Sequence, residues 1–186
     1  MKPTNYEHAV GTLYGQACGD ALGTTLEFKG ASECHRLFPG GLRTIIGGGA
    51  FRVAAGQVTD DTELALALAR SLSAQQVYDR ASVLASYQAW AKSGPIDMGC
   101  ATGSALLRGM PNDRTEANGA LMRVSPLGVF CASLHSTALA VELGRADAAL
   151  THPNKVCQDA SGIFTATIAR CVSRPLRPVE EVFAFA

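Results

Sequence analysis

The sequence has no net charge, no closely paired cysteines and no long apolar run, and each absence excludes a class of protein. Its 16 Lys and Arg residues balance 16 Asp and Glu residues, so no net field attracts nucleic acid or an anionic membrane. The six cysteines form no C-x-x-C pair, which favours a reduced, cytoplasmic setting over a disulfide framework. No apolar run is long enough to span a bilayer, and residues 1–5 lack the apolar core of a signal peptide. We therefore expect neither nucleic acid nor a membrane among the partners.

The residues that are present are typical of one globular domain. Hydrophobic residues make up 47% of the 186-residue chain, which is enough for a substantial core. Three consecutive glycines at 47–49 lack the spacing of a G-x-G-x-x-G or P-loop fingerprint, so they do not indicate either kind of nucleotide site. The sequence predicts a single domain over residues 1–186.

Apolar residues recur at helical spacing along most of the chain, and no segment shows the strict alternation of a strand. Helices are predicted over 7–22, 31–38, 62–72, 77–91, 100–107, 133–149, 156–172 and 179–185. Pro126 is expected in the first turn of a further helix. The predicted fold class is all-α.

Glycine recurs at every fourth position of the first predicted helix, at Gly11, Gly15, Gly19 and Gly23. A glycine inside a helix costs about 1 kcal/mol relative to alanine. We interpret the glycine stripe as a face along which another backbone approaches closely.

Two adjacent acids, Asp60 and Asp61, lie between Thr59 and Thr62 at the start of a strongly apolar helix. One interpretation is a helix cap, with Asp60 as the N-cap and Glu63 completing a capping box. The other is a site for a hard cation, because Mg²⁺ and Mn²⁺ prefer carboxylate and hydroxyl oxygens. A cap requires only one acid, so we favour the cation site.

Five further residues have both a functional and a structural interpretation. Glu27 lies between two large apolar residues, as a ligand or as a satisfied buried group does. Asn118-Gly119 readily takes positive φ, which would aim backbone amides at an anion, but Asn-Gly also forms ordinary turns. Arg123, four residues after Gly119, is either an anion-binding residue or a surface residue. His152 either binds a ligand or serves as a capping or packing residue.

Taken together, these features resemble the ADP-ribosylglycohydrolase family, because they occur in the order of the family's motifs. The matching segments are Gly15-x-x-x-Gly19-Asp20-Ala21-Leu22-Gly23 with Glu27, Gly47-Gly48-Gly49-x-Phe51, Gly56-Gln57-x-Thr59-Asp60-Asp61-Thr62, Asp97-x-Gly99, Asn118-Gly119-x-x-Met122-Arg123-x-x-Pro126-x-Gly128 and Thr151-His152. They extend from Gly11 to about Ala169.

The resemblance implies an all-α orthogonal helical bundle and metal-dependent hydrolysis of the N- or O-glycosidic bond of ADP-ribosylated substrates. It implies two Mg²⁺ or Mn²⁺ ions per site, and an ADP-ribosylated protein or a small ADP-ribosyl compound as substrate. By position, the metal ligands would be Thr59, Asp60, Asp61 and Glu27, of which the three acids would also be the catalytic residues. Asn118, Gly119, Arg123 and His152 would bind the ADP-ribose.

The sequence departs from the family in one respect. Members carry a Gly-x-Asp-x-Asp-Thr motif in their C-terminal part, which this sequence does not contain. We favour the interpretation that the family fold is truncated here at its C-terminus. The alternatives are that a second copy or a complementing chain supplies the missing ligands, or that this is a non-catalytic ADP-ribose-binding or structural member. Three carboxylates are too few to hold two octahedral cations well, so we expect these 186 residues alone to hydrolyse poorly or not at all.

Overall fold

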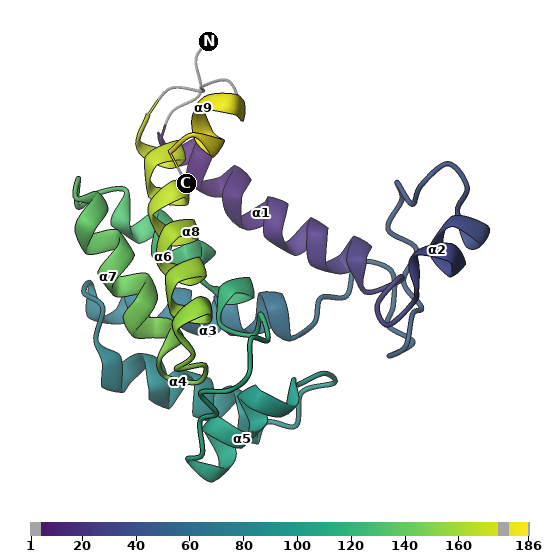
Figure 1. Ribbon diagram of the computed structural model, residues 1–186, viewed down its shortest axis with the longest axis horizontal. Helices are drawn as coiled ribbons and strands as arrows, with labels where there is room; N and C mark the ends of the chain where they lie inside the picture. Colours follow the sequence, from purple (N-terminus) through teal and green to yellow (C-terminus); the bar gives the residue numbers. More distant parts are fainter. Residues whose placement is uncertain (1–4, 175–178, 186) are drawn as a thin grey trace.

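The computed structural model describes residues 5–174 and 179–185, and confirms the all-α class (Figure 1). Its helices are α1 (Asn5–Gly23), α2 (Ala31–Leu37), α3 (Asp60–Gln75), α4 (Arg80–Lys92), α5 (Cys100–Arg108), the 3₁₀ helix η1 (Leu121–Arg123), α6 (Ser125–Cys131), α7 (Thr137–Ala148), α8 (Lys155–Ser173) and α9 (Val179–Phe183). The described residues form no named strand, only an isolated antiparallel bridge between Gly48 and Val53.

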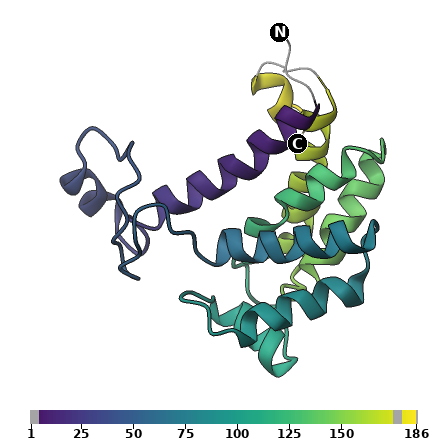
Figure 2. The same ribbon diagram turned by 180° about the vertical axis from the view of Figure 1, so that it is seen from behind.

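Helix α3 lies at the centre of the bundle, as its apolar sequence predicts. Seen from behind, it crosses between α4 and α5 on one side and α6 to α8 on the other (Figure 2). Leu64 and Leu68 of α3 are fully buried, against Val83 and Tyr87 of α4 and Leu127 of α6. The start of α3, which carries the paired acids, is thereby fixed to the hydrophobic core.

Helices α7 and α8 pack against each other more extensively than any other pair, and glycines make this possible. A β-carbon at Gly144 would lie 2.6 Å from Thr165 Oγ1 and 2.7 Å from the Ser161 carbonyl oxygen. At Gly162, a β-carbon would lie 2.8 Å from the carbonyl oxygen of Val141. Both helices therefore depend on glycine for their close approach.

The glycine stripe of α1 serves no such purpose, and the predicted close approach of a backbone is wrong. Among the residues that the structure describes, a β-carbon at Gly11, Gly15, Gly19 or Gly23 would meet nothing within 4 Å. Helix α1 instead contacts α3, α6 and α8 and extends away from the bundle towards α2 (Figure 1). It brings polar side chains near its C-terminal end to the start of α3.

Helices α4 and α7 begin at Arg80 and Thr137, later than the starts at residues 77 and 133 that periodicity predicts. Side-chain caps explain both starts. Asp79 accepts a hydrogen bond from the Ser82 N–H (2.6 Å) at the start of α4, and Ser136 accepts one from the Leu139 N–H (3.2 Å) at the start of α7. Pro126 lies in the first turn of α6, as predicted.

Some apolar side chains remain exposed on helices α3 and α8. Leu66 is 45% exposed, and Ile163 and Phe164 are 41% and 43% exposed. In residues 5–174 and 179–185, no helix combines the length and apolar character that crossing a membrane requires.

Candidate active site

A cleft of about 650 Å³ lies where the C-terminal end of α1, the start of α3 and the start of α5 meet. Seven of the eight residues predicted to form the site line it, namely Glu27, Thr59, Asp60, Asp61, Asn118, Gly119 and His152. The structure therefore brings Glu27 to the same cavity as Asp60 and Asp61, although they are far apart in the sequence.

Asp20 of α1 organises the loop that presents the paired acids. Its carboxylate accepts hydrogen bonds from the Thr59 N–H (2.9 Å) and hydroxyl (2.8 Å), and from the Thr62 N–H (3.2 Å) and hydroxyl (2.6 Å). An acid from another helix thus caps α3 and opposes the positive end of its dipole. Because the Thr59 hydroxyl donates its proton to Asp20, its lone pairs are free to bind a cation.

The capping-box interpretation of Asp60 is wrong. Helix α3 begins at Asp60, its N-cap is Thr59, and the Thr59 side chain makes no cap hydrogen bond. Glu63 does not reach back to the N-cap either, because its carboxylate accepts a hydrogen bond from Trp90 Nε1 (2.7 Å). Asp60 is therefore not the N-cap of α3, and Glu63 does not complete a capping box with it.

The turn that carries Glu27 is held by the glycine-rich loop. The Thr25 hydroxyl donates to the Gly47 carbonyl oxygen (3.0 Å), and the Phe28 ring packs edge-on against Phe51, with 5.9 Å between centroids. Gly49 has φ +69°, and a β-carbon there would collide with the Thr24 carbonyl oxygen. Glycine at 49 therefore allows the loop to pack against the turn that places Glu27 in the cleft.

Five acids line the cleft. Besides Asp20, they are Glu27, Asp60, Asp61 and Asp97, which we call the carboxylate cluster. Burial first, and then the charges of Asp97 and Asp61, raise the pKa of Asp60 to about 7. Burial and the charge of Asp20 raise the pKa of Asp61 to about 6. Burial and the neighbouring acids also raise the pKa of Glu27. All these neighbouring charges are negative, so the cluster favours a proton or a cation.

Asp97 is a member of the cluster that the sequence analysis did not assign to the site. It precedes α5, and its carboxyl is hydrogen-bonded to the Asp60 carboxyl and to the Met98 N–H, while burial raises its pKa. The Gly99 N–H donates to Asp60. The Asp97-x-Gly99 spacing was visible in the sequence, but nothing local showed that it would meet Asp60.

The cluster fits a divalent cation in chemistry but only partly in number. Carboxylates and the Thr59 hydroxyl are the oxygen donors that Mg²⁺ and Mn²⁺ prefer. However, in the described part of the chain no three His, Cys, Asp or Glu side chains are grouped closely enough to hold a metal ion. The donors present are therefore suitable in kind, and the set is incomplete as arranged.

A second wall of the cleft is formed by His152, Gly119 and Thr102. A β-carbon at Gly119 would lie 2.8 Å from His152 Cε1, 3.1 Å from His152 Nε2 and 2.8 Å from Thr102 Oγ1. Neither Asn118 nor Gly119 takes positive φ, so the predicted anion-binding turn does not form. Gly119 matters because a β-carbon at this position would crowd both the imidazole and the threonine hydroxyl.

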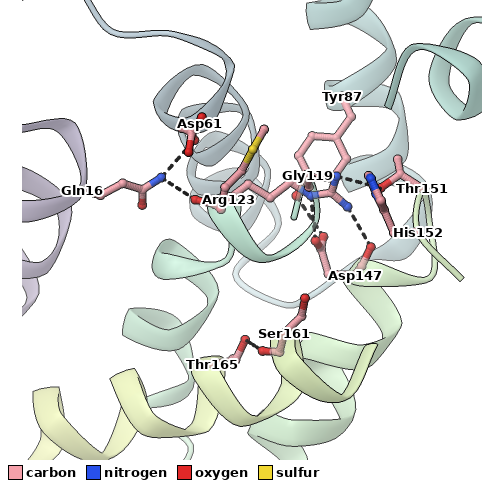
Figure 3. Close-up of polar contacts among 11 residues, drawn as sticks. Gln16, Asp61, Tyr87, Gly119, Arg123, Asp147, Thr151, His152, Ser161 and Thr165 are labelled. Carbon is pink, nitrogen blue, oxygen red and sulfur yellow. Dashed lines mark hydrogen bonds and ion pairs between the residues drawn. The ribbon is translucent and has the colours of Figure 1, made fainter. Parts of the chain in front are cut away.

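Arg123 does not line the cleft as predicted, because its side chain is fully buried in an ion pair (Figure 3). Its Nε donates to Asp147 Oδ2 (3.0 Å), and its Nη2 donates to the Asp147 carbonyl oxygen (2.9 Å). Its guanidinium also lies 4.3 Å from the centre of the Tyr87 ring. Arg123 reaches the cleft only indirectly, through the hydrogen bond from Nη1 to Thr151 Oγ1 (2.9 Å).

Gln16 is another residue that sequence reasoning missed. Its Nε2 donates to the carbonyl oxygens of Asp61 and Met122, both at 2.9 Å, and so connects α1, α3 and η1 beside the cleft (Figure 3). A polar residue within an otherwise apolar or glycine-rich helical face is the only signal that the sequence offers for it.

The comparisons with known proteins identify the family of the chain. The family model for ADP-ribosylglycohydrolase matches residues 1–186. The chain is 39% identical over 132 residues to "ADP-ribosyl-[dinitrogen reductase] glycohydrolase" from Rhodospirillum rubrum, covering 67% of this chain and 45% of that protein. It is 35% identical over 140 residues to "ADP-ribosylarginine hydrolase Tri1" from Pseudomonas putida (strain GB-1), covering 67% of this chain and 36% of that protein.

A solved structure titled "ADP-ribosylglycohydrolase-related protein complex" has a TM-score of 0.77 and 29% identity, covering 97% of this chain and 61% of that one. The chain belongs to the ADP-ribosylglycohydrolase family. It spans less than half the length of the two curated relatives described above.

Proposed function

We propose that the protein hydrolyses the N- or O-glycosidic bond that joins ADP-ribose to an acceptor, and so releases ADP-ribose. The observation that carries this proposal is the convergence of the carboxylate cluster with His152 and Gly119 in one cleft. A volume of about 650 Å³ lies within the range of roughly 300–1,000 Å³ that is usual for small-molecule sites. The names of the two relatives support an ADP-ribosylated protein as substrate, with arginine as the first acceptor to test.

In the proposed reaction, a carboxylate accepts a proton from water as the water oxygen bonds to the anomeric carbon. The glycosidic bond breaks, and the leaving nitrogen or oxygen takes up a proton. We assign the proton transfer to Glu27, because Asp60 is only 5% exposed and is hydrogen-bonded to Asp97, whereas Glu27 is half-buried. A raised pKa suits Glu27 to both accept and return a proton.

We also propose Mg²⁺ or Mn²⁺ as the cofactor, with Thr59, Asp60 and Asp61 as the residues that would hold it, and Glu27 beside them as a further ligand or as the acid–base group. When bound, the cation would supply positive charge that orients the ribose and stabilises charge developing during the reaction. Asp20 would act by fixing Thr59 and the turn that carries Asp60 and Asp61.

The division into a single domain over residues 1–186 and the cytoplasmic setting remain predictions from the sequence. A second copy or a complementing chain as the source of further ligands likewise remains a proposal. The comparisons do not favour the alternative of a non-catalytic member of the family.

The test is an assay of ADP-ribose release. The purified chain is incubated with ADP-ribosylated arginine peptide and Mn²⁺ or Mg²⁺, and free ADP-ribose is quantified by chromatography. We expect slow release, below the usual lower limit of about 1 s⁻¹, because the ligand set is incomplete. The release should disappear in Asp61→Asn. Release that is unchanged in Asp61→Asn would contradict the assignment of this cleft as the active site.

A further inference from the structure

His152 presents one ring nitrogen to the protein interior and the other to the cleft. Its side chain is almost fully buried, and its Nδ1 lies 2.8 Å from Thr151 Oγ1. In the part of the chain that the structure describes, the buried Nε2 has no hydrogen-bond partner. Since His152 lines the cleft, a ligand in the cleft is the partner that this nitrogen lacks.

The position of the imidazole proton follows from Arg123. Its Nη1 lies 2.9 Å from Thr151 Oγ1, and a guanidinium only donates, so Thr151 is the acceptor of this bond. The Thr151 hydroxyl proton is then left to be donated, and His152 Nδ1 lies within reach. If Nδ1 carried the proton instead, the hydroxyl proton of the fully buried Thr151 would be left without a described acceptor, which is unfavourable.

We infer that Arg123 and Thr151 are positioning residues that fix His152 as the tautomer protonated on Nε2, so that His152 donates a hydrogen bond to an acceptor oxygen of the bound ADP-ribose. This inference rests on the proposed function for the identity of the ligand. The direction of the bond, from protein to ligand, rests only on the contacts around Thr151.

The chain of hydrogen bonds from Arg123 through Thr151 to His152, which we call the relay, is held rigidly at Arg123. Arg123 donates to Asp147 through both Nε and Nη2, and the Tyr87 hydroxyl donates to the other carboxylate oxygen of Asp147 (2.9 Å). The guanidinium cannot rotate to release Thr151 without leaving a buried carboxylate unpaired, which costs several kcal/mol in proteins generally. The direction of donation from Arg123 through Thr151 to His152 is therefore fixed.

His152 is also kept neutral. Burial and the charge of Arg123 lower its pKa to about 4. At neutral pH the ring therefore carries a single proton, and accepting from Thr151 at Nδ1 leaves that proton on Nε2. A neutral donor binds an oxygen without bringing a second positive charge next to Arg123.

The space between residue 119 and Nε2 is small, and any side chain at position 119 would fill it. A β-carbon there would lie 3.1 Å from Nε2 and 2.8 Å from Thr102 Oγ1, so both groups border the same small volume. An oxygen atom of the ligand placed there can accept from His152, while the Thr102 hydroxyl can donate or accept. Hydroxyl and phosphate oxygens of ADP-ribose both satisfy this requirement.

The first test observes the tautomer directly in the free protein. Long-range ¹H–¹⁵N NMR spectra of the imidazole nitrogens distinguish a protonated from an unprotonated ring nitrogen. We expect the Nε2 of His152 to have the shift of a protonated nitrogen and Nδ1 that of an unprotonated one at neutral pH. The opposite pattern, or a ring protonated on both nitrogens, would overturn the inference whatever the protein binds.

The second test measures ADP-ribose affinity by isothermal titration calorimetry in a matched pair of variants. Thr151→Val keeps the shape of the side chain and removes the hydroxyl, whereas Thr151→Ser keeps the hydroxyl. We expect an affinity loss of about tenfold in Thr151→Val, as for one hydrogen bond, and close to wild-type affinity in Thr151→Ser. In Thr151→Val the His152 tautomer signals should also change.

The outcomes separate the inference from the proposed function. Wild-type affinity in Thr151→Val, with its fold confirmed by circular dichroism, would overturn the relay and leave the proposed function standing. Equal loss in Thr151→Val and Thr151→Ser would also overturn it, because packing rather than the hydroxyl would then be responsible. If the wild-type chain shows the expected tautomer but does not bind ADP-ribose, the proposed function is wrong, and ADP-ribose is not the ligand that accepts from His152.

Discussion

Replacing Asp60 by asparagine should stabilise the metal-free protein at alkaline pH. Asp60 is 5% exposed and its carboxyl is hydrogen-bonded to that of Asp97, so its ionised form is both poorly hydrated and repelled. Asparagine has nearly the same shape, cannot ionise, and can donate from its amide to the Asp97 carboxylate. The substitution removes the repulsion while leaving the packing in place.

The magnitude follows from the pKa of Asp60, which rises from its ordinary value of 3.8 to about 7. Between these pH values the folded chain keeps a proton that the unfolded chain has released, so the free energy of unfolding falls as pH rises. Three pKa units are worth about 4 kcal/mol. Because Asp97 shares the proton and would keep its own charge, we expect Asp60→Asn to gain about 2 kcal/mol at about pH 8, and nothing at about pH 4.

The assay is urea unfolding in EDTA, followed by circular dichroism, for the wild type and Asp60→Asn across this pH range. Asp113→Asn, which removes a carboxylate from an exposed surface turn, is the matched control and should change stability by less than about 0.5 kcal/mol. If Asp60→Asn is no more stable than the wild type at about pH 8, the argument that the acids repel one another in the cleft is incorrect.

Three other substitutions test separate parts of the structure. Asp20→Ala removes the acceptor of four hydrogen bonds at the start of α3 and should destabilise the protein by about 2 kcal/mol in urea unfolding; an unchanged midpoint would count against its capping role. Gly119→Ala places a methyl group against His152 and Thr102, and should weaken ADP-ribose binding in calorimetry by tenfold or more; unchanged binding would exclude this wall from the site. Gly15→Ala should raise the free energy of unfolding by up to about 1 kcal/mol, because no described residue crowds the new β-carbon. Gly144→Ala should lower it by about 1–3 kcal/mol, because the new β-carbon would lie 2.6 Å from Thr165 Oγ1. Equal effects of the two substitutions in thermal unfolding would refute the packing described for α7 and α8.

The two glycine positions in this comparison also show where sequence reasoning stops. Gly15 and Gly144 both lie inside helices and look alike in the sequence, yet only Gly144 faces a backbone. Helical periodicity predicted the elements themselves, because it depends on neighbours three or four residues away. The partner of a helix face depends on tertiary packing, so the purpose of the α1 glycine stripe was not predictable.

The same distinction applies to the site. Asp60, Asp61 and Glu27 could be named as candidates from the sequence because unusual local contexts and the family resemblance both marked them, and all three line the cleft. The capping of α3 by Asp20, which lies 39 residues before Thr59, was not predictable from local sequence. Arg123 was assigned to the ligand because it follows Asn118-Gly119 and matches a family motif. Its partner Asp147, 24 residues later, is an ordinary acid in a predicted helix, and nothing local indicates their buried pairing.

The central claim is that the carboxylate cluster and the His152 wall form one cation-dependent ADP-ribose site. Isothermal titration of ADP-ribose into the purified chain, once with Mn²⁺ and once with EDTA, tests it most directly. We predict binding that is tighter with Mn²⁺ than with EDTA, and loss of the Mn²⁺ effect in Asp61→Asn. Failure of the folded chain to bind ADP-ribose, or equal affinity in Mn²⁺ and in EDTA, would contradict the claim.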